Sequence, residues 1–67
     1  MNTFAVRLKE LRADANLSTT QLGAAIGVTS MTISRWERMK RIPNIENLIA
    51  LAKYFKVSTD YLCGLED

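Results

Sequence analysis

The sequence predicts an all-α domain of five helices. No run of residues alternates apolar and polar side chains between turn signals, which is the pattern of a half-buried strand. Apolar residues instead recur every three or four positions in several stretches, as they do along one side of a helix. Capping residues and helix-ending residues separate these stretches, and the only proline, Pro43, lies between two of them.

The first helix is expected over residues 4–15, where apolar residues recur at helical spacing. Asn2 or Thr3 lies near its start as a cap, and Asn16 is suited to end it. Its charged side chains, Arg7 among them, are expected to be mostly solvated. Its apolar stripe consists of Phe4, Leu8, Leu11 and Ala15.

The second helix is expected over residues 19–26. Ser18 and Gln21 have the spacing of a capping box, in which each side chain bonds the other residue's backbone N–H. Leu17 and Leu22 flank this box as a hydrophobic staple. These signals together mark a helix start.

A tight turn at Gly27 leads to the third helix, expected over residues 30–38, because glycine tolerates a left-handed backbone. Thr29 can cap this helix. Gly23 has no side chain at the point where the two crossing helices would press hardest on each other. The two helices therefore form a closely packed, angled pair.

A proline-containing connector precedes the fourth helix, expected over residues 45–56 with Asn44 as its cap. A short fifth helix is expected over residues 59–63, between Ser58 as its cap and Gly64 as its end. The fourth helix has the strongest apolar stripe in the chain: Ile45, Leu48, Ile49, Ala52 and Phe55.

With 67 residues, the chain is expected to form one domain, residues 1–67, with a small core. One cysteine and no histidine exclude an intrachain disulfide and argue against a metal site. Cys63 is expected to be a small buried residue rather than a redox centre. The sequence offers no carboxylate pair and no glycine-rich phosphate loop, so we expect no catalytic residue, no cofactor and no small-molecule substrate.

Neither a targeting segment nor a membrane span is indicated. The first residues, MNTFAVRLK, lack the long apolar region of a signal peptide. The longest apolar run, Leu48 to Ala52, is too short to span a bilayer. We therefore expect a cytoplasmic protein that makes no membrane contact.

The stretch from Thr19 to Glu37, TTQLGAAIGVTSMTISRWE, resembles the helix-turn-helix of phage repressors and Cro proteins, the XRE family. The likeness extends over residues 8–64 and includes Gly23 and Gly27. It implies a compact, lambda-repressor-like domain of five helices with the helix-turn-helix in helices 2 and 3. The apolar positions that carry it are Leu22, Ile26, Val28, Ile33 and Trp36.

The resemblance implies a sequence-specific transcription regulator, most typically a repressor, that binds a palindromic operator in double-stranded DNA. A homodimer that is weak without DNA is expected, with Tyr61, Leu62 and Leu65 supplying its apolar contact. An alternative is a regulator or antitoxin that uses the same fold to bind a protein. That alternative would call for an apolar outer side on the third helix.

On a helical wheel, one arc of the third helix lies opposite Ile33 and Trp36, and in the resembled family this arc enters the major groove. Arg35 is the leading base reader, because guanidinium can bond both guanine acceptors, although phosphate contact or simple solvation stays open. Met31 can touch a thymine methyl or be exposed by chance. The expected base readers are Ser30, Met31, Ser34 and Arg35.

Residues 35–41, RWERMKR, hold four of the nine basic residues against one acid. Such a cluster can be a solvated surface, but its place at the end of the third helix favours phosphate contact. The start of the second helix adds hydroxyls and free backbone N–H groups. Asn44 is assigned to capping rather than to phosphate. The expected phosphate ligands are Thr19, Thr20, Thr32, Arg38, Lys40 and Arg41.

Arg12 and Glu37 match the arginine and glutamate that form a semi-buried ion pair in the resembled family. Two solvated charges are the alternative, but neutralisation by Arg12 would stop Glu37 from opposing phosphate binding. The chain departs from the family at Met39, where glycine is usual. A left-handed Met39 would cost about 1–2 kcal/mol, and any other backbone there would end the third helix differently.

Overall fold

The computed structural model describes residues 2–66, which form five helices joined by short connections. No strand occurs in this part of the chain, so the predicted all-α class is confirmed. The helices are α1 (Asn2–Asp14), α2 (Thr19–Ile26), α3 (Ser30–Glu37), α4 (Ile45–Phe55) and α5 (Thr59–Cys63).

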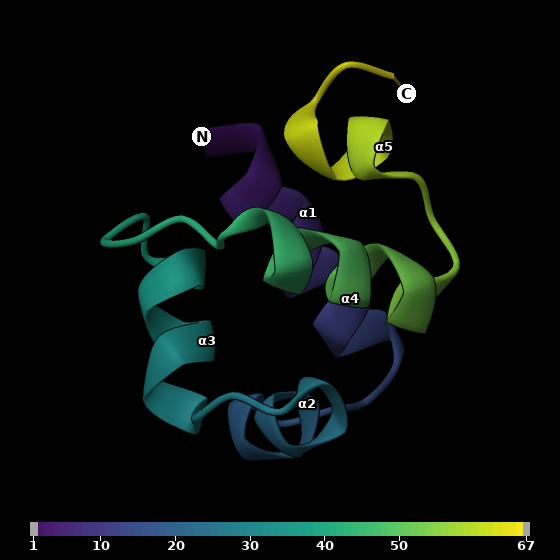
Figure 1. Cartoon of the computed structure of the whole chain (residues 1–67). Helices are drawn as coiled ribbons and strands as arrows, with labels where there is room; N and C mark the ends of the chain where they lie inside the picture. The colour runs from purple at the N-terminus through teal and green to yellow at the C-terminus, as the bar shows by residue number, and fades with distance from the viewer. Residues whose placement is uncertain (1, 67) are drawn as a thin grey trace.

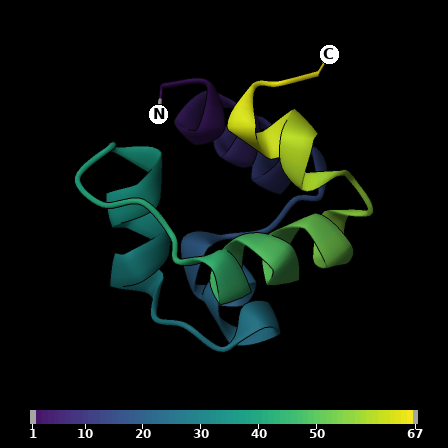
Figure 2. The same cartoon turned by 45° about the horizontal axis from the view of Figure 1, so that its top comes forward.

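Figure 1 shows α3 standing beside one end of α4, with α2 below them and α1 behind α4. α2 packs on α3, α1 packs on both α3 and α5, and α4 packs on α2 and α5. The first turn of α1 and the segment after α5 lie on the side away from α2 in both views (Figures 1 and 2). α2 and the start of α3 therefore lie on the side of the domain away from the first turn of α1 and the segment after α5.

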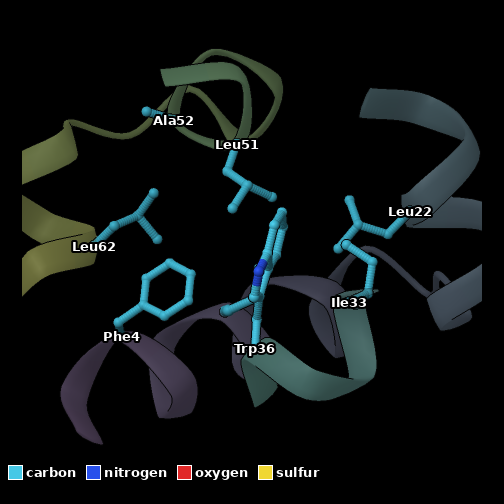
Figure 3. Packing of buried hydrophobic residues seen from close by; sticks show 8 residues of the cluster. Phe4, Leu22, Ile33, Trp36, Leu51, Ala52 and Leu62 are labelled. Carbon is cyan, nitrogen blue, oxygen red and sulfur yellow. The ribbon is translucent and has the colours of Figure 1, made fainter. Parts of the chain in front are cut away.

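Every helix supplies a side chain to one apolar core (Figure 3). The indole ring of Trp36 stands between Leu51 and Ile33, while Phe4 and Leu62 fill the other side. Trp36 is only 3% exposed, so its ring packs in the core and offers no stacking surface. The fully buried side chains are Phe4, Leu8, Leu22, Ile33, Leu51 and Leu62.

Four helices begin at the predicted caps. The side-chain oxygen of each cap accepts a hydrogen bond from the backbone N–H three residues later, which satisfies one of the free donors of the first turn. The capping box is complete, because the Ser18 N–H also donates to Gln21 Oε1 at 2.8 Å. The caps are Ser18, Thr29, Asn44 and Ser58.

A residue with a left-handed backbone follows every helix, and three of these five residues are not glycine. Met39 has φ 61°, so it adopts the conformation for which glycine is usual. Its N–H bonds the Trp36 carbonyl, and the next N–H, from Lys40, bonds Arg35 O at 2.9 Å. This is the Schellman pattern. The left-handed residues are Asn16, Gly27, Met39, Lys56 and Gly64.

Several predicted boundaries differ from the observed ones. α1 already includes Asn2, two residues before the predicted start, so neither Asn2 nor Thr3 is its cap. α1, α3 and α4 each end one residue earlier than predicted, because the residue after each of them already leaves the helix to close the turn. Cys63 is half-buried rather than buried.

The predicted stripe of α4 is only partly buried. Leu48 and Phe55 pack against the core, but Ile45 is 69% exposed and Ile49 is 41% exposed. Ala52, also predicted, is buried in the core, and so is Leu51, which the predicted stripe left out. Because α4 is apolar around most of its circumference, its spacing alone does not select the side that packs.

Gly23 makes the closest approach in the helix-turn-helix, as predicted, but its neighbour is the turn rather than α3 itself. A Cβ built on Gly23 would lie 2.6 Å from the Val28 carbonyl oxygen and 3.1 Å from the Thr29 carbonyl carbon. These atoms belong to the backbone and cannot rotate away. The absence of a side chain at Gly23 is what allows α3 to start so close to α2.

Gly23→Ala should therefore lower the free energy of unfolding by about 1–3 kcal/mol through overpacking, although alanine is the better helix former. Urea denaturation followed by circular dichroism measures this. Ala24→Gly, on the exposed side of the same helix, is the matched control and should cost about 1 kcal/mol through helix propensity. If Gly23→Ala stabilises the domain, propensity dominates and the close approach has no energetic role.

Candidate nucleic-acid interface

α3 is attached to the core by one side, and its other side faces solvent. Ile33 and Trp36 are buried, whereas Met31 is 60% exposed and Arg35 is exposed as well. Ser34 is half-buried between these two sides. The arc predicted to read bases is therefore the outer side of α3.

The first residues of α2 and α3 are joined by a hydrogen bond. Thr19 Oγ1 lies 2.8 Å from Ser30 Oγ, and both residues are half-buried. Thr19 is a predicted phosphate ligand and Ser30 a predicted base reader, so the structure brings the two sets together at this point. Thr20, the neighbouring predicted phosphate ligand, is exposed and makes no side-chain hydrogen bond within the described residues.

Thr32 is also hydrogen-bonded to a neighbour, Thr29. Its backbone N–H donates to Thr29 Oγ1 at 3.1 Å, and the two hydroxyl oxygens lie 2.9 Å apart. Thr32 is half-buried, one turn before Trp36 on the same side of α3. Its hydroxyl can still bond a further group, since a hydroxyl has one donor and two acceptor sites.

A groove of about 370 Å³ runs between α3, the α3–α4 connector and the start of α4. It brings Arg35 and Arg41 together with Thr32, which were predicted separately as a base reader and as phosphate ligands. Two arginines and several uncharged polar groups make this groove attractive to an anion. Its lining residues are Thr32, Arg35, Trp36, Arg41, Ile42, Pro43, Asn44 and Asn47.

The four basic residues of the 35–41 cluster do not all line the same groove. Arg38 lies at the end of α3 and lines a second, smaller groove against Val6 and Lys9 of α1. Lys40 follows the left-handed Met39 and is exposed. A ligand in the first groove would thus meet Arg35 and Arg41 but not Arg38.

Arg12 and Glu37 form the predicted ion pair. Arg12 Nε donates to Glu37 Oε2 at 2.6 Å and Nη2 donates to Oε1 at 2.9 Å, which is the two-pronged geometry that suits guanidinium and carboxylate. Their side chains are 18% and 8% exposed. Arg12 Nη1 also donates to Leu17 O at 2.8 Å, so the pair ties α1 and the loop after it to the end of α3.

The carboxylate of Glu37 is neutralised within the fold and does not oppose an anion near α3. The hydrogen bond to Glu37 raises the pKa of Arg12, while partial burial of the guanidinium acts in the opposite direction. The ion pair therefore favours the charged form of Arg12.

Arg7 has a role that its sequence position did not indicate. Its guanidinium lies 4.2 Å from the centre of the Tyr61 ring, in cation–π geometry. It also donates to the backbone carbonyls of Tyr61 and Glu66, and the Glu66 carboxylate accepts from Ser58 Oγ. Arg7 thus holds the segment after α5 against α1, on the side of the domain away from α2.

The apolar surface expected near the C-terminal end for a twofold contact is not present, because two of its three residues are covered. Leu62 is fully buried in the core, because α5 turns its apolar side toward α1 and α4. Tyr61 is half-buried under Arg7, and only Leu65, at 76% exposed, remains available. A single exposed leucine is not an apolar surface.

Within residues 2–66, no three histidine, cysteine or carboxylate side chains come close enough together to hold a metal ion. In the same part of the chain, no helix combines the length and the apolar character that a bilayer crossing requires.

Comparison with known proteins gives a consistent result. The Helix-turn-helix family matches residues 8–62. The chain is 41% identical to Repressor protein C2 of Salmonella phage P22, over 92% of this chain and 30% of that protein. It is 38% identical to the HTH-type transcriptional activator BcrR of Enterococcus faecalis, over 96% of this chain and 31% of that protein. The chain thus spans less than a third of the length of these two relatives.

Among solved structures, the chain is similar to the P22 c2 repressor crystallised in complex with a synthetic operator. The TM-score is 0.89 at 36% identity, and the match covers 94% of this chain and 96% of that chain. The solution structure of the DNA-binding domain of the P22 c2 repressor matches with a TM-score of 0.83 at 40% identity, over 94% of this chain and 86% of that chain.

Arg12 and Glu37 should be energetically coupled, because removal of either leaves the other largely buried without its partner. Arg12→Ala and Glu37→Ala should each cost about 1–3 kcal/mol of unfolding free energy, and the double variant should cost clearly less than the sum. Chemical denaturation of the four proteins measures the coupling.

Arg38 provides the matched control for this cycle, because it is exposed and lies next to Glu37 in the sequence without pairing to it. The cycle of Arg38→Ala with Glu37→Ala should be additive. Additive costs in the Arg12 cycle as well would mean that the ion pair contributes nothing beyond two solvated charges.

Proposed function

This chain belongs to the Helix-turn-helix family that matches residues 8–62, and from that membership we propose that it is a sequence-specific regulator of transcription that binds double-stranded DNA through α3. The observation that carries the proposal is the outer side of α3, which is polar, basic and exposed. It lies beside the groove that Arg35 and Arg41 line, and the buried side of the same helix is fixed in the core. Such a helix fits the major groove without rearrangement of the domain.

Base reading is assigned to the outer arc of α3. Arg35 is exposed and can present two donors to the N7 and O6 acceptors of guanine. Met31, near the N-terminal end of α3, has an exposed thioether side chain that suits the methyl group of thymine. Ser30 and Ser34 have shorter side chains and are assigned to bases that lie close to α3. The hydrogen bond to Thr19 orients the Ser30 hydroxyl.

Phosphate contacts are assigned to both sides of this arc. Thr19 and Thr20 lie at the start of α2, where free backbone N–H groups attract an anion. Thr32 and Arg41 share the groove beside Arg35, and a phosphate bound there would place the base-reading arginine next to the DNA backbone. Lys40 and Arg38 extend this positive region, and the pairing of Glu37 with Arg12 leaves no free carboxylate inside it.

We further propose that the protein acts as a repressor, on an inverted repeat and as a homodimer. The P22 relative is a repressor and its solved structure holds an operator, whereas BcrR is an activator. Occupation of the operator is the proposed mode of repression. On DNA, the two copies of α3 would lie about 34 Å apart, one helical turn.

A protein-binding role is less well supported. It would call for an apolar outer arc on α3, and Met31 is the one apolar side chain exposed there among the described residues.

A base-reading residue and a phosphate-binding residue should respond differently to substitution by alanine. Arg35→Ala should cost about 1–3 kcal/mol on the preferred site and relax the sequence preference at one base pair per half-site. Lys40→Ala should weaken binding to all duplexes alike and reduce the slope of log affinity against log salt by about one. A binding selection from random DNA, followed by salt titration, measures both effects.

Lys53→Ala, at an exposed lysine near the end of α4, is the control for the loss of one positive charge. If Arg35→Ala leaves the selected sequence unchanged and acts only through the salt slope, Arg35 is a phosphate ligand. If the wild-type protein selects no sequence at all, the proposed function is wrong.

A further inference from the structure

The hydroxyls of Thr19 and Ser30 form a pair where α2 and α3 begin. Thr19 is the first residue of α2, Ser30 is the first residue of α3, and their side-chain oxygens lie 2.8 Å apart. Neither hydroxyl has another hydrogen-bond partner within residues 2–66. Both residues are half-buried, so neither is sealed from a ligand. We call these two groups the hydroxyl pair.

The hydroxyl pair has a single hydrogen to offer to a ligand. A hydroxyl carries one hydrogen and two lone pairs, and one of the two hydrogens is used in the bond between the oxygens. The remaining hydrogen belongs to whichever residue accepts that bond. If Ser30 donates to Thr19, only Thr19 can donate outward, and if Thr19 donates to Ser30, only Ser30 can. The two residues therefore cannot both donate to DNA.

A phosphate decides between these two states. Thr19 lies at the start of α2, where the free backbone N–H groups of the first turn attract an anion, and its proposed ligand is a phosphate. A phosphate of the DNA backbone is an anion without a hydrogen, so it accepts hydrogen bonds and donates none. Thr19 must therefore use its hydrogen for the phosphate and accept from Ser30. Ser30 keeps only its lone pairs for a base.

We infer that Ser30 reads an amino group, either N6 of adenine or N4 of cytosine, because its own hydrogen is held by Thr19. The inference rests on the proposed function. Guanine and thymine instead present the keto oxygens O6 and O4 in the major groove. A keto oxygen at this place would meet a lone pair of Ser30, or it would take the Ser30 hydrogen and so cost Thr19 its bond to the phosphate. Thr19 is thus a positioning residue that sets the base preference of Ser30 without touching a base.

Every base pair has an amino base on one strand and a keto base on the other, so a selected sequence alone does not show which group is read. The test starts from the base pair whose preference is relaxed by Ser30→Ala in a binding selection. In one duplex its amino group is replaced by hydrogen, with purine in place of adenine or 2-pyrimidinone in place of cytosine. In another duplex its keto oxygen is replaced by sulfur, a weak acceptor, with 4-thiothymine or 6-thioguanine.

Removal of the amino group should lower the affinity of the wild-type protein about threefold to tenfold more than that of Ser30→Ala, which is the value of one hydrogen bond. Both proteins meet the same duplexes, so the ratio of their losses cancels the weakening of the base pair itself. Sulfur in place of the keto oxygen should lower the affinity of the two proteins by equal factors.

Thr19→Val removes the hydroxyl at nearly constant shape and frees the Ser30 hydrogen for a base. The measured quantity is the keto penalty, the affinity for the selected duplex divided by the affinity for a duplex in which that base pair is inverted. In the wild-type protein the keto penalty includes the lost bond between Thr19 and the phosphate, so Thr19→Val should lower it about threefold to tenfold.

Thr19→Ser keeps the hydroxyl and should keep the wild-type keto penalty. Thr20→Val is the matched control, because it removes the neighbouring hydroxyl, which lies outside the pair. It should weaken binding to both duplexes alike and leave the keto penalty unchanged. Circular dichroism checks that each variant is folded.

A purely structural role for Thr19 would lower the affinity for both duplexes and leave the keto penalty unchanged, and that result overturns the inference. The inference is also overturned if Ser30→Ala selects the same sequence as the wild-type protein, if the amino group contributes equally to both proteins, or if sulfur weakens only the wild-type protein. A wild-type protein that selects no sequence at all would instead overturn the proposed function.

Discussion

The burial of Trp36 is the constraint on which the rest of the structure depends. With its indole ring fixed among side chains from the other helices and Ile33 buried one turn before it, the rotation of α3 about its own axis is set. At about 100° per residue, that rotation leaves Met31 and Arg35 on the solvent side. The same packing therefore stabilises the fold and selects the residues that can meet DNA.

Both ends of α3 are then held by interactions that are independent of the core. At its start, Gly23 lets the turn carbonyl of Val28 approach α2 closely, which sets the crossing of the two helices. At its end, Glu37 is held by Arg12, and the left-handed Met39 turns the chain so that Arg41 comes back beside the helix. The cost of a left-handed methionine, about 1–2 kcal/mol, is offset by the two hydrogen bonds that close the turn.

The features that could be predicted from the sequence are those decided within a few residues or by the family likeness. Caps such as Ser18 and Asn44 act on the next turn of their own helix, so local spacing was sufficient. Interactions between distant segments had no such signal. Arg7 meets Tyr61 across 54 positions, and α4 is apolar on too many sides for its spacing to show that Ile45 faces solvent. The roles of individual residues toward DNA remain predictions, because a free domain shows exposure but not contact.

An NMR titration of the labelled protein with an inverted-repeat duplex from a binding selection tests the central claim most directly, namely that the outer side of α3 is the DNA-binding surface. We expect the largest backbone amide shift changes at residues 19–20, 30–35 and 40–41, and small ones in α5 and the segment after it. Shift changes concentrated on α5 and the exposed side of α1, with the amides of α3 unmoved, would contradict the claim.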